Sequence, residues 1–211
     1  KGHAAPGLYA VLAERGYFPK EDLETLRHIG SHLQGHPNMN DTPGVDMSTG
    51  SLGQGVSAAV GMALASKVWN DGYRVFAILG DGEIEEGQVW EAAMFAGNHQ
   101  LDNLCLVVDH NGLQIDGTIE EVNSAMPIAD KFRAFKFHVI ELADGNDMGQ
   151  IRAAFSAARE VTGQPVCIVA ETVKGKGVSF MENEVDWHGK GPNDGQYEQA
   201  LAELEAAGKE L

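Results

Sequence analysis

Short apolar runs alternate with amphipathic stretches along most of the chain, and this alternation predicts a layered α/β fold. Apolar runs of strand length occupy residues 74–79, 104–108, 137–142 and 165–171. Apolar positions that recur every three or four residues predict helices at 4–14, 20–28, 52–70, 83–98, 127–135 and 147–159. Alternating strands and helices imply a doubly wound, mostly parallel sheet with helices on both faces.

Two of the predicted helices carry more specific expectations. In the helix 20–28, we expect Leu23, Leu26 and Ile29 to line one face. The helix 52–70 is dense in Gly, Ala and Ser, so another helix can approach it closely. Packing in the core and packing at a subunit interface are both compatible with that composition.

Two long stretches lack any periodicity. The first, residues 29–53, is long for a loop inside a compact domain, and such loops are usually functional or mobile. The second, residues 172–192, begins with the glycine- and lysine-rich run Lys174-Gly175-Lys176-Gly177. That run suits a loop that closes over phosphate, and it equally suits a plain flexible loop.

The composition is that of an acidic globular protein. The 211 residues are 43% apolar and carry a formal net charge of −16, which argues against binding to nucleic acid, whose phosphates need a basic face. No apolar run approaches the ~20 residues of a membrane span. The two cysteines, Cys105 and Cys167, lie in apolar runs, as expected of buried thiols in a reducing compartment. We therefore expect a cytoplasmic protein that binds neither nucleic acid nor membrane.

The length suits one domain with a sizeable core. We expect this domain to span residues 1–192 and residues 193–211 to form a C-terminal surface helix or tail. The chain opens inside a motif at Lys1, without a Met, so we expect that an N-terminal portion is missing.

Acidic and amide side chains follow two of the predicted strands. The triplet Gly80-Asp81-Gly82 comes after the first strand, and Asn111 follows the second. Adjacent parallel strands would place Asp81 and Asn111 side by side at their carboxyl ends, where open α/β sheets bind ligands. Their oxygens suit Mg²⁺, and the N-terminus of the following helix offers N–H groups to anions. The triplet alone would fit a tight turn, but together with Asn111 it favours a seat for Mg²⁺ and a diphosphate.

The Gly-Asp-Gly triplet, a gap of 28 residues and Asn111 resemble the thiamine-diphosphate-binding motif. That motif usually ends in two Asn, whereas here it ends in His110-Asn111 and retains the ligand position. In particular, the chain resembles the N-terminal, thiamine-diphosphate-binding subunit of transketolases that are split into two chains. The resemblance extends from residue 1 to about residue 192, and its motifs lie at 1–4, 35–37, 48–55, 80–87 and 188–189.

The resemblance implies a set of site residues. Mg²⁺, for which Ca²⁺ or Mn²⁺ can substitute, would be held by Asp81, Asn111 and the backbone carbonyl of Leu113. The implied catalytic residues are His3, His36, His188 and Glu86. The residues implied to bind thiamine diphosphate are Gly50, Leu52, Gly80, Asp81, Gly82, Asn111, Lys174 and His188.

Four acidic residues fall within one predicted helix, at Glu83, Glu85, Glu86 and Glu91. A favourable interaction of these negative charges with the helix dipole would account for all four acidic residues. The family resemblance instead assigns Glu86 and Glu91 to a carboxylate network near a subunit interface.

The resemblance also implies an activity and a partner. The reaction would move a two-carbon ketol unit from a ketose phosphate to an aldose phosphate, as in the pentose phosphate pathway. A second domain of the family holds the aminopyrimidine of the cofactor, and this chain is too short to include it. We therefore expect that the partner is a C-terminal transketolase subunit, that the chain self-associates in a dimer, and that the assembly holds two copies of each chain.

Several alternatives remain at this point. Within the same cofactor class they are a 1-deoxy-xylulose-5-phosphate synthase, the α subunit of a 2-oxoacid dehydrogenase, and a transketolase specialised for sugar acids or branched sugars. A non-catalytic assembly subunit would be expected to lose a metal ligand first, yet Asp81 and Asn111 are both present. A nucleotide-binding protein on a similar sheet is disfavoured because the chain has neither of the usual glycine-rich phosphate motifs.

Overall fold

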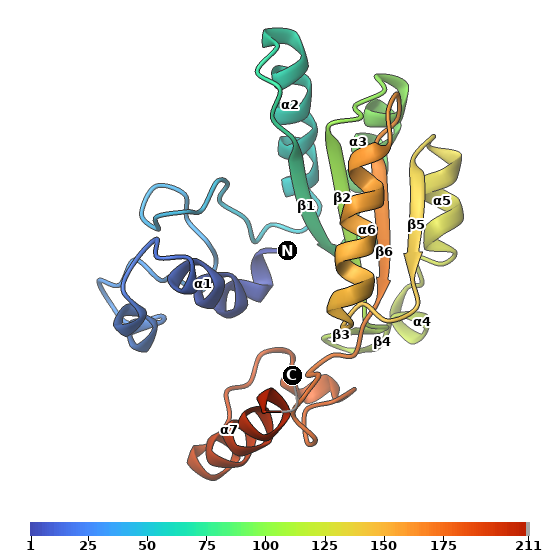
Figure 1. The fold of residues 1–211 in the computed structure, drawn as a ribbon. Coiled ribbons are helices and arrows are strands. Elements are labelled where there is room, and N and C mark those ends of the chain that lie inside the picture. Colours follow the sequence, from blue (N-terminus) through green and yellow to red (C-terminus); the bar gives the residue numbers. More distant parts are fainter. Residues whose placement is uncertain (210–211) are drawn as a thin grey trace.

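A computed structural model describes residues 1–209, and a four-stranded parallel sheet forms its centre (Figure 1). The strands lie in the order β1-β2-β6-β5. Their bounds are β1 Val75–Gly80, β2 Leu104–His110, β5 His138–Leu142 and β6 Val166–Glu171. All neighbouring pairs are parallel. The four apolar runs are therefore confirmed as strands of one parallel sheet.

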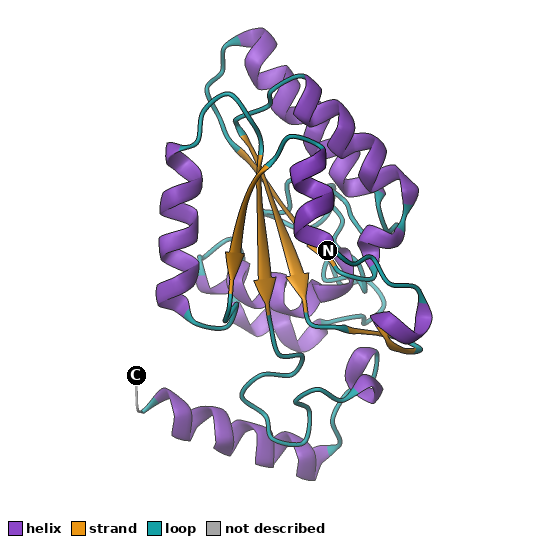
Figure 2. Ribbon diagram, turned by 90° about the vertical axis from the view of Figure 1, so that its right-hand side faces the viewer, coloured by secondary structure: helices purple, strands orange, loops and turns teal. Residues whose placement is uncertain are grey.

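Helices cover both faces of this sheet, as predicted (Figure 2). Helices α2 (Gln54–Trp69), α3 (Gly87–Asn98) and α5 (Ile128–Ala134) bury one face in the larger core, and α6 (Met148–Glu160) packs on the other. The buried positions of α2 and α3 are mostly alanine and valine. Such small side chains let the two helices pack closely against each other.

The residues that precede α2 build a small core of their own. Helix α1 (Ala5–Glu14) follows the 3₁₀ turn η1 (Gly2–Ala4), and a second 3₁₀ turn, η2, spans Lys20–Thr25. The buried side chains of this region form one cluster that includes Tyr9 in α1 and Leu33 in the loop that follows η2. This part of the chain is called the N-terminal lobe below.

The helix predicted at residues 20–28 is wrong in its length and in one buried position. The helical turn ends at Thr25, and Arg27 adopts a positive φ of 64°. The Arg27 N–H then donates to the carbonyl of Leu33 at 2.9 Å, so the chain reverses direction. As a result Ile29 is fully exposed, although Leu23 still packs on the lobe's core.

Residues 83–98 also differ from the single helix that was predicted. The 3₁₀ turn η3 (Glu83–Glu85) is followed by Glu86 in an extended conformation, and α3 begins at Gly87. The break accommodates the buried Glu83 carboxylate, which bonds back to the sheet edge. The N-terminus of α3 therefore does not follow Asp81 directly, because the turn η3 lies between them.

The remaining elements are short, apart from the last helix. They are the hairpin β3 (Leu113–Gln114) and β4 (Gly117–Thr118), the helix α4 (Ile119–Val122), the 3₁₀ turn η4 (Val185–His188) and the helix α7 (Asp194–Gly208). The helix α7 buries only Ala200 among its described residues, as the predicted surface helix would; residues 210–211 of that prediction lie outside the described residues. That residues 193–211 are a unit separate from residues 1–192 stays a prediction. None of the described helices combines the length and hydropathy that a bilayer-spanning segment needs.

The close approach of α3 to the loop before β5 provides a test of the packing. A Cβ atom added to Gly97 would lie 1.8 Å from the carbonyl oxygen of Phe135. We expect Gly97→Ala to lower the free energy of unfolding by roughly 3 kcal/mol, because backbone must move to admit the methyl group. The control is Gly61→Ala in α2, where no atom lies within 4 Å, and which should raise stability by about 0.5–1 kcal/mol. Urea unfolding measures both, and equal stabilities would contradict this packing.

Candidate functional site

The carboxyl ends of β1 and β2 meet at one edge of the sheet. Gly80 pairs with Asp109 in the parallel register, so the residues that follow, Asp81 and Asn111, lie at the same edge as predicted. Asp81 is buried, with 2% of its surface exposed. Its carboxylate accepts hydrogen bonds from the N–H groups of Gly82 at 2.9 Å and Gly112 at 2.6 Å. The side-chain oxygen of Asn111 faces its own loop and accepts the N–H of Leu113 at 3.1 Å.

The environment of Asp81 favours a bound cation. Burial raises the pKa of the Asp81 carboxyl, although the N–H groups of Gly112 and Gly82 oppose this rise. A carboxylate has about four lone-pair directions, so these two hydrogen bonds leave acceptor capacity for a ligand. A divalent cation would stabilise this negative charge, which is largely shielded from water.

The oxygen atoms at this edge also fit the predicted metal. Within residues 1–209, no three His, Cys, Asp or Glu side chains gather so that they could hold a metal ion. The predicted protein ligands are one carboxylate, from Asp81, and the neutral oxygens of Asn111 and Leu113. Mg²⁺ commonly takes only one or two protein carboxylates and completes its coordination with phosphate and water. The donor set at this edge therefore fits Mg²⁺.

Three histidines from distant segments gather beside this edge. The rings of His3 and His36 contact each other with centroids 4.8 Å apart and planes at 80°. His188 lies beside Lys174, with its Nδ1 atom 3.5 Å from the lysine Nζ. All three histidines are exposed. The structure thus brings together three of the predicted catalytic residues, whose roles stay predictions.

The electrostatics of His3 and His188 favour neutral imidazoles. Partial burial lowers the pKa of His3, and the neighbouring His36 lowers it further. Burial also lowers the pKa of His188, with Lys174 and His3 acting in the same direction. The pKa of Lys174 is lowered, chiefly by its own burial. Neutral imidazoles can both donate and accept a hydrogen bond, which suits contacts with sugar hydroxyls.

Two of the glycines implied to bind the cofactor, Gly50 and Gly82, take close-packed or unusual backbone positions. Gly50 has a φ of +141°, and a Cβ atom there would lie 2.8 Å from the His36 ring. A Cβ on Gly82 would lie 3.0 Å from the Gln114 side chain. Leu52, in contrast, is 44% exposed. Contact of these residues with a cofactor stays a prediction.

Glu86 and Glu91 occupy different surroundings from Asp81. Glu91 lies on α3 and Glu86 is the N-cap residue of α3, and both side chains are exposed. The Glu86 side chain packs against Gly53, where an added Cβ would lie 2.8 Å away. The predicted catalytic or interface role of Glu86 is not tested by these contacts.

The sequence pattern does not distinguish Glu83 from the other acids of the predicted helix, but the structure gives it a separate role. Glu83 is 8% exposed. Its carboxylate accepts the N–H of Gly53 at 3.1 Å and the N–H of Gly80 at 3.1 Å. It therefore fastens the end of the long loop to the end of β1. Its place between a glycine and an apolar residue, Gly82 and Ile84, was the only local signal of burial.

We expect Glu83→Gln to lower the free energy of unfolding by about 1–3 kcal/mol, because the amide NH₂ would face one of the two backbone donors and leave it unpaired. The control is Glu85→Gln, since Glu85 is partly exposed and accepts a single bond from Gln114 at 3.2 Å. That control should change stability by less than about 0.5 kcal/mol. Urea unfolding separates the two, and equal losses would show that Glu83 has no special role.

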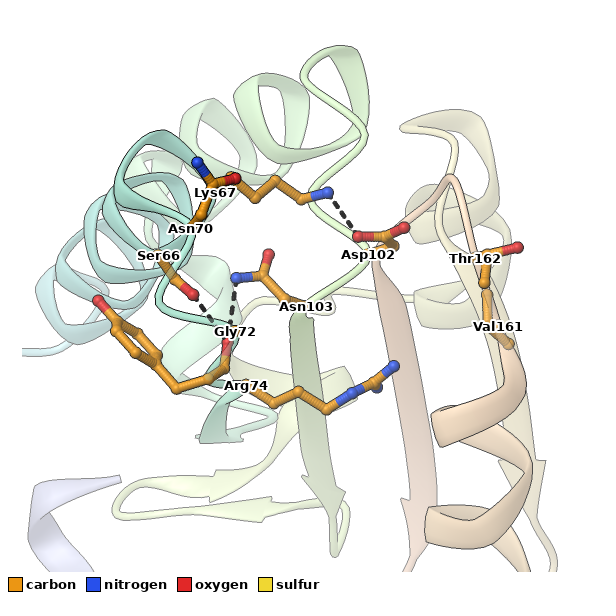
Figure 3. Close-up of a pocket in the computed structure, with 10 residues that line it drawn as sticks. Ser66, Lys67, Asn70, Gly72, Arg74, Asp102, Asn103, Val161 and Thr162 are labelled. Atoms are coloured by element: carbon orange, nitrogen blue, oxygen red, sulfur yellow. Dashed lines mark hydrogen bonds and ion pairs between the residues drawn. The ribbon is translucent and has the colours of Figure 1, made fainter.

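A hollow of 530 Å³ lies at the opposite, amino-terminal end of the sheet (Figure 3). Its walls include Lys67 and Arg74, but both are already engaged: Lys67 pairs with Asp102 at 2.5 Å and Arg74 bonds to the carbonyl of Arg159 at 3.0 Å. The hollow is remote from Asp81. It therefore belongs to a different part of the molecule from the candidate site.

Comparison with known proteins agrees with this geometry. A family model described as "Transketolase, thiamine diphosphate binding domain" matches residues 1–205. A 6-deoxy-6-sulfo-D-fructose transketolase subunit of Clostridium sp. (strain MSTE9) is 48% identical over 99% of this chain and 75% of its own length. An apulose-4-phosphate transketolase subunit of Phocaeicola vulgatus is 41% identical over 97% of this chain and 72% of its own length.

Solved structures show the same fold. The transketolase of Campylobacter jejuni superposes with a TM-score of 0.90 at 32% identity, over 97% of this chain and 33% of that chain. This chain thus spans about a third of such a transketolase and most of the separate subunits. It belongs to the transketolase family, and it is the thiamine diphosphate binding domain that the relatives above carry in a separate subunit.

Proposed function

We propose that this chain is the diphosphate-binding half of a thiamine-diphosphate-dependent transketolase and works with a partner chain that carries the pyrimidine-binding half. The observation that carries the proposal is the meeting of buried Asp81 with Asn111 at one sheet edge, beside the cluster of His3, His36 and His188. Ligands of open α/β sheets bind at this edge.

The side chains at this edge divide into two groups. Asp81, Asn111 and the carbonyl of Leu113 would hold Mg²⁺, or Ca²⁺ or Mn²⁺ in its place. Lys174 is partly buried near Asp81 and Asp109, where its ammonium group would bind the diphosphate. When bound, thiamine diphosphate supplies the nucleophilic carbon and the electron sink that ketol transfer requires.

The three histidines would contact the sugar substrate rather than bind the metal. Imidazole rings can donate a hydrogen bond to a carbonyl or hydroxyl oxygen and, when neutral, accept a proton from a hydroxyl group. The contact of His3 with His36 fixes the edge of one ring against the face of the other. Together they would orient the ketose and move protons at its hydroxyl oxygens.

We propose an anionic ketose as the donor, either a sugar phosphate or a related sugar acid or branched sugar. The names of two relatives support this range, since one is named for a sulfo-sugar and the other for apulose 4-phosphate. The experiment is a donor panel with the two chains mixed: xylulose 5-phosphate of the pentose phosphate pathway, 6-deoxy-6-sulfofructose, apulose 4-phosphate and pyruvate. Transfer of a two-carbon unit from a ketose supports the proposal. Decarboxylation of pyruvate without ketol transfer would contradict it and favour the alternative enzymes of this cofactor class.

We also infer a cytoplasmic assembly with two copies of each chain. The buried free thiols of Cys105 and Cys167 suit a reducing compartment. The exposed Met94 and Phe95 on α3 offer apolar surface for contact between copies. Mass measurement of the mixed chains tests the stoichiometry.

A further inference from the structure

We propose that Asp109 is a positioning residue that ties three separate segments of the site to the end of β2. This inference rests on the proposed function, because it assigns Asp109 the task of orienting residues that would bind the cofactor and the sugar. Asp109 itself would touch neither the metal nor the substrate.

The carboxylate of Asp109 bonds to two segments that are distant in sequence. One oxygen forms an ion pair with the Nζ atom of Lys1, and the other accepts the hydroxyl hydrogen of Thr172. The backbone carbonyl of Asp109 accepts the N–H of Asp81 at 3.3 Å. A fourth bond runs from the N–H of Thr172 to the carbonyl of His110 at 3.0 Å. Asp109 thus joins the N-terminal lobe, β1 and the loop after β6.

Each of these contacts lies two residues before a predicted site residue. Lys1 precedes His3, Asp109 precedes Asn111, and Thr172 precedes Lys174. Two residues of extended chain span at most about 7 Å. A shift of the Asp109 contacts would therefore displace the histidine, amide and ammonium groups that follow.

Burial makes these contacts stronger than ordinary surface pairs. The side chains of Lys1 and Asp109 are 25% and 29% exposed, and partly buried pairs are screened less by salt than exposed ones. The N-terminal segment is also packed tightly at Gly2, where an added Cβ would lie 2.5 Å from the backbone of Gly50. Lys1 therefore anchors a segment that has little room to adjust.

The same strand offers a matched control at its other end. Asp102 precedes β2, pairs with Lys67 at 2.5 Å and accepts the N–H of Gly163 at 2.9 Å. Its side chain is 29% exposed, the same fraction as that of Asp109. Asp102 and Asp109 thus make similar bonds, but only Asp109 lies at the site.

The test compares Asp109→Asn with Asp102→Asn in the complex of both chains. Calorimetric titration with thiamine diphosphate at fixed Mg²⁺ should show affinity about 10–100-fold weaker for Asp109→Asn, the range seen when groups that orient metal ligands are removed. Asp102→Asn should bind within about twofold of wild type. With cofactor saturating, Asp109→Asn should also raise KM for the ketose, because His3 is no longer held in place.

A second pair of variants, at Thr172, separates loss of the positioning contact from a general loss of folding. Thr172→Val removes the hydroxyl and should weaken cofactor binding, whereas Thr172→Ser keeps the hydroxyl and should restore it. Wild-type affinity in Asp109→Asn, or equal losses in the Asp109 and Asp102 variants, would overturn the positioning role alone. A folded wild-type complex that binds no thiamine diphosphate would overturn the proposed function and this inference with it.

Discussion

Replacement of Asp81 by alanine is expected to abolish binding of thiamine diphosphate with Mg²⁺, with a loss of affinity well above about 100-fold. Removing a group that merely orients a metal ligand already costs about 10–100-fold, and Asp81 would be the anionic ligand itself. Its carboxylate also accepts the N–H groups of Gly82 and Gly112, so the substitution releases the backbone on both sides of the site. Charge and backbone order would be lost together.

Calorimetric titration of the two-chain complex measures this effect. Asp81→Asn separates the two causes, since it removes the charge but keeps an acceptor for a backbone N–H group. The control is Asp116→Ala, because Asp116 is exposed in the nearby hairpin turn. Unchanged cofactor affinity in a folded Asp81→Ala variant would show that Asp81 is not a ligand. A folded wild-type complex without any affinity would instead favour a non-catalytic assembly subunit.

Omission of the partner chain is expected to lower ketol transfer by roughly 10³-fold or more, the scale of losing preorganised groups around a reacting atom. The structure gives the physical reason. His3, His36 and His188 are all exposed, so the edge that would hold the reacting carbon is open to water. Catalysis of this type needs a site from which water is excluded. In the proposed assembly, the second chain would cover the histidines.

Reconstitution tests the requirement for a partner. The chain alone should be inactive, and titration with the C-terminal subunit should restore activity up to a fixed ratio. The partner mixed with Asp81→Ala should stay inactive, which excludes activity of the partner alone. Ketol transfer by the single chain at the rate of the mixture would contradict the prediction.

The sheet and the meeting of Asp81 with Asn111 at its edge could be predicted from the sequence because both depend on local patterns. The apolar runs that became β1 and β2 fix the parallel register, and that register alone brings Asp81 beside Asn111. The histidines are different, because His3, His36 and His188 come from three segments without a shared pattern. Only the resemblance to a family placed them together.

The errors arose where a tertiary hydrogen bond overrides local preference. Glu83 resembles the other acidic residues at the start of the predicted helix. Its buried carboxylate, however, accepts the N–H groups of Gly53 and Gly80 and so links the long loop to β1. The chain breaks after it, at Glu86, for that reason. At Ile29, a reversal set by Arg27 and Leu33 replaced the expected helical face. The sequence patterns around Glu83 and Ile29 do not specify these hydrogen bonds.

The contacts of Asp109 also determine when the site can assemble during synthesis. The N-terminal lobe has its own apolar cluster and can collapse soon after it leaves the ribosome. Its ion pair between Lys1 and Asp109 spans 108 positions, and the bond from Thr172 needs a further stretch of chain. Long-range contacts of this kind form late, because the chain must close a large loop first. Docking of the lobe that carries His3 through these contacts therefore requires both β2 and the residues after β6 to have been made.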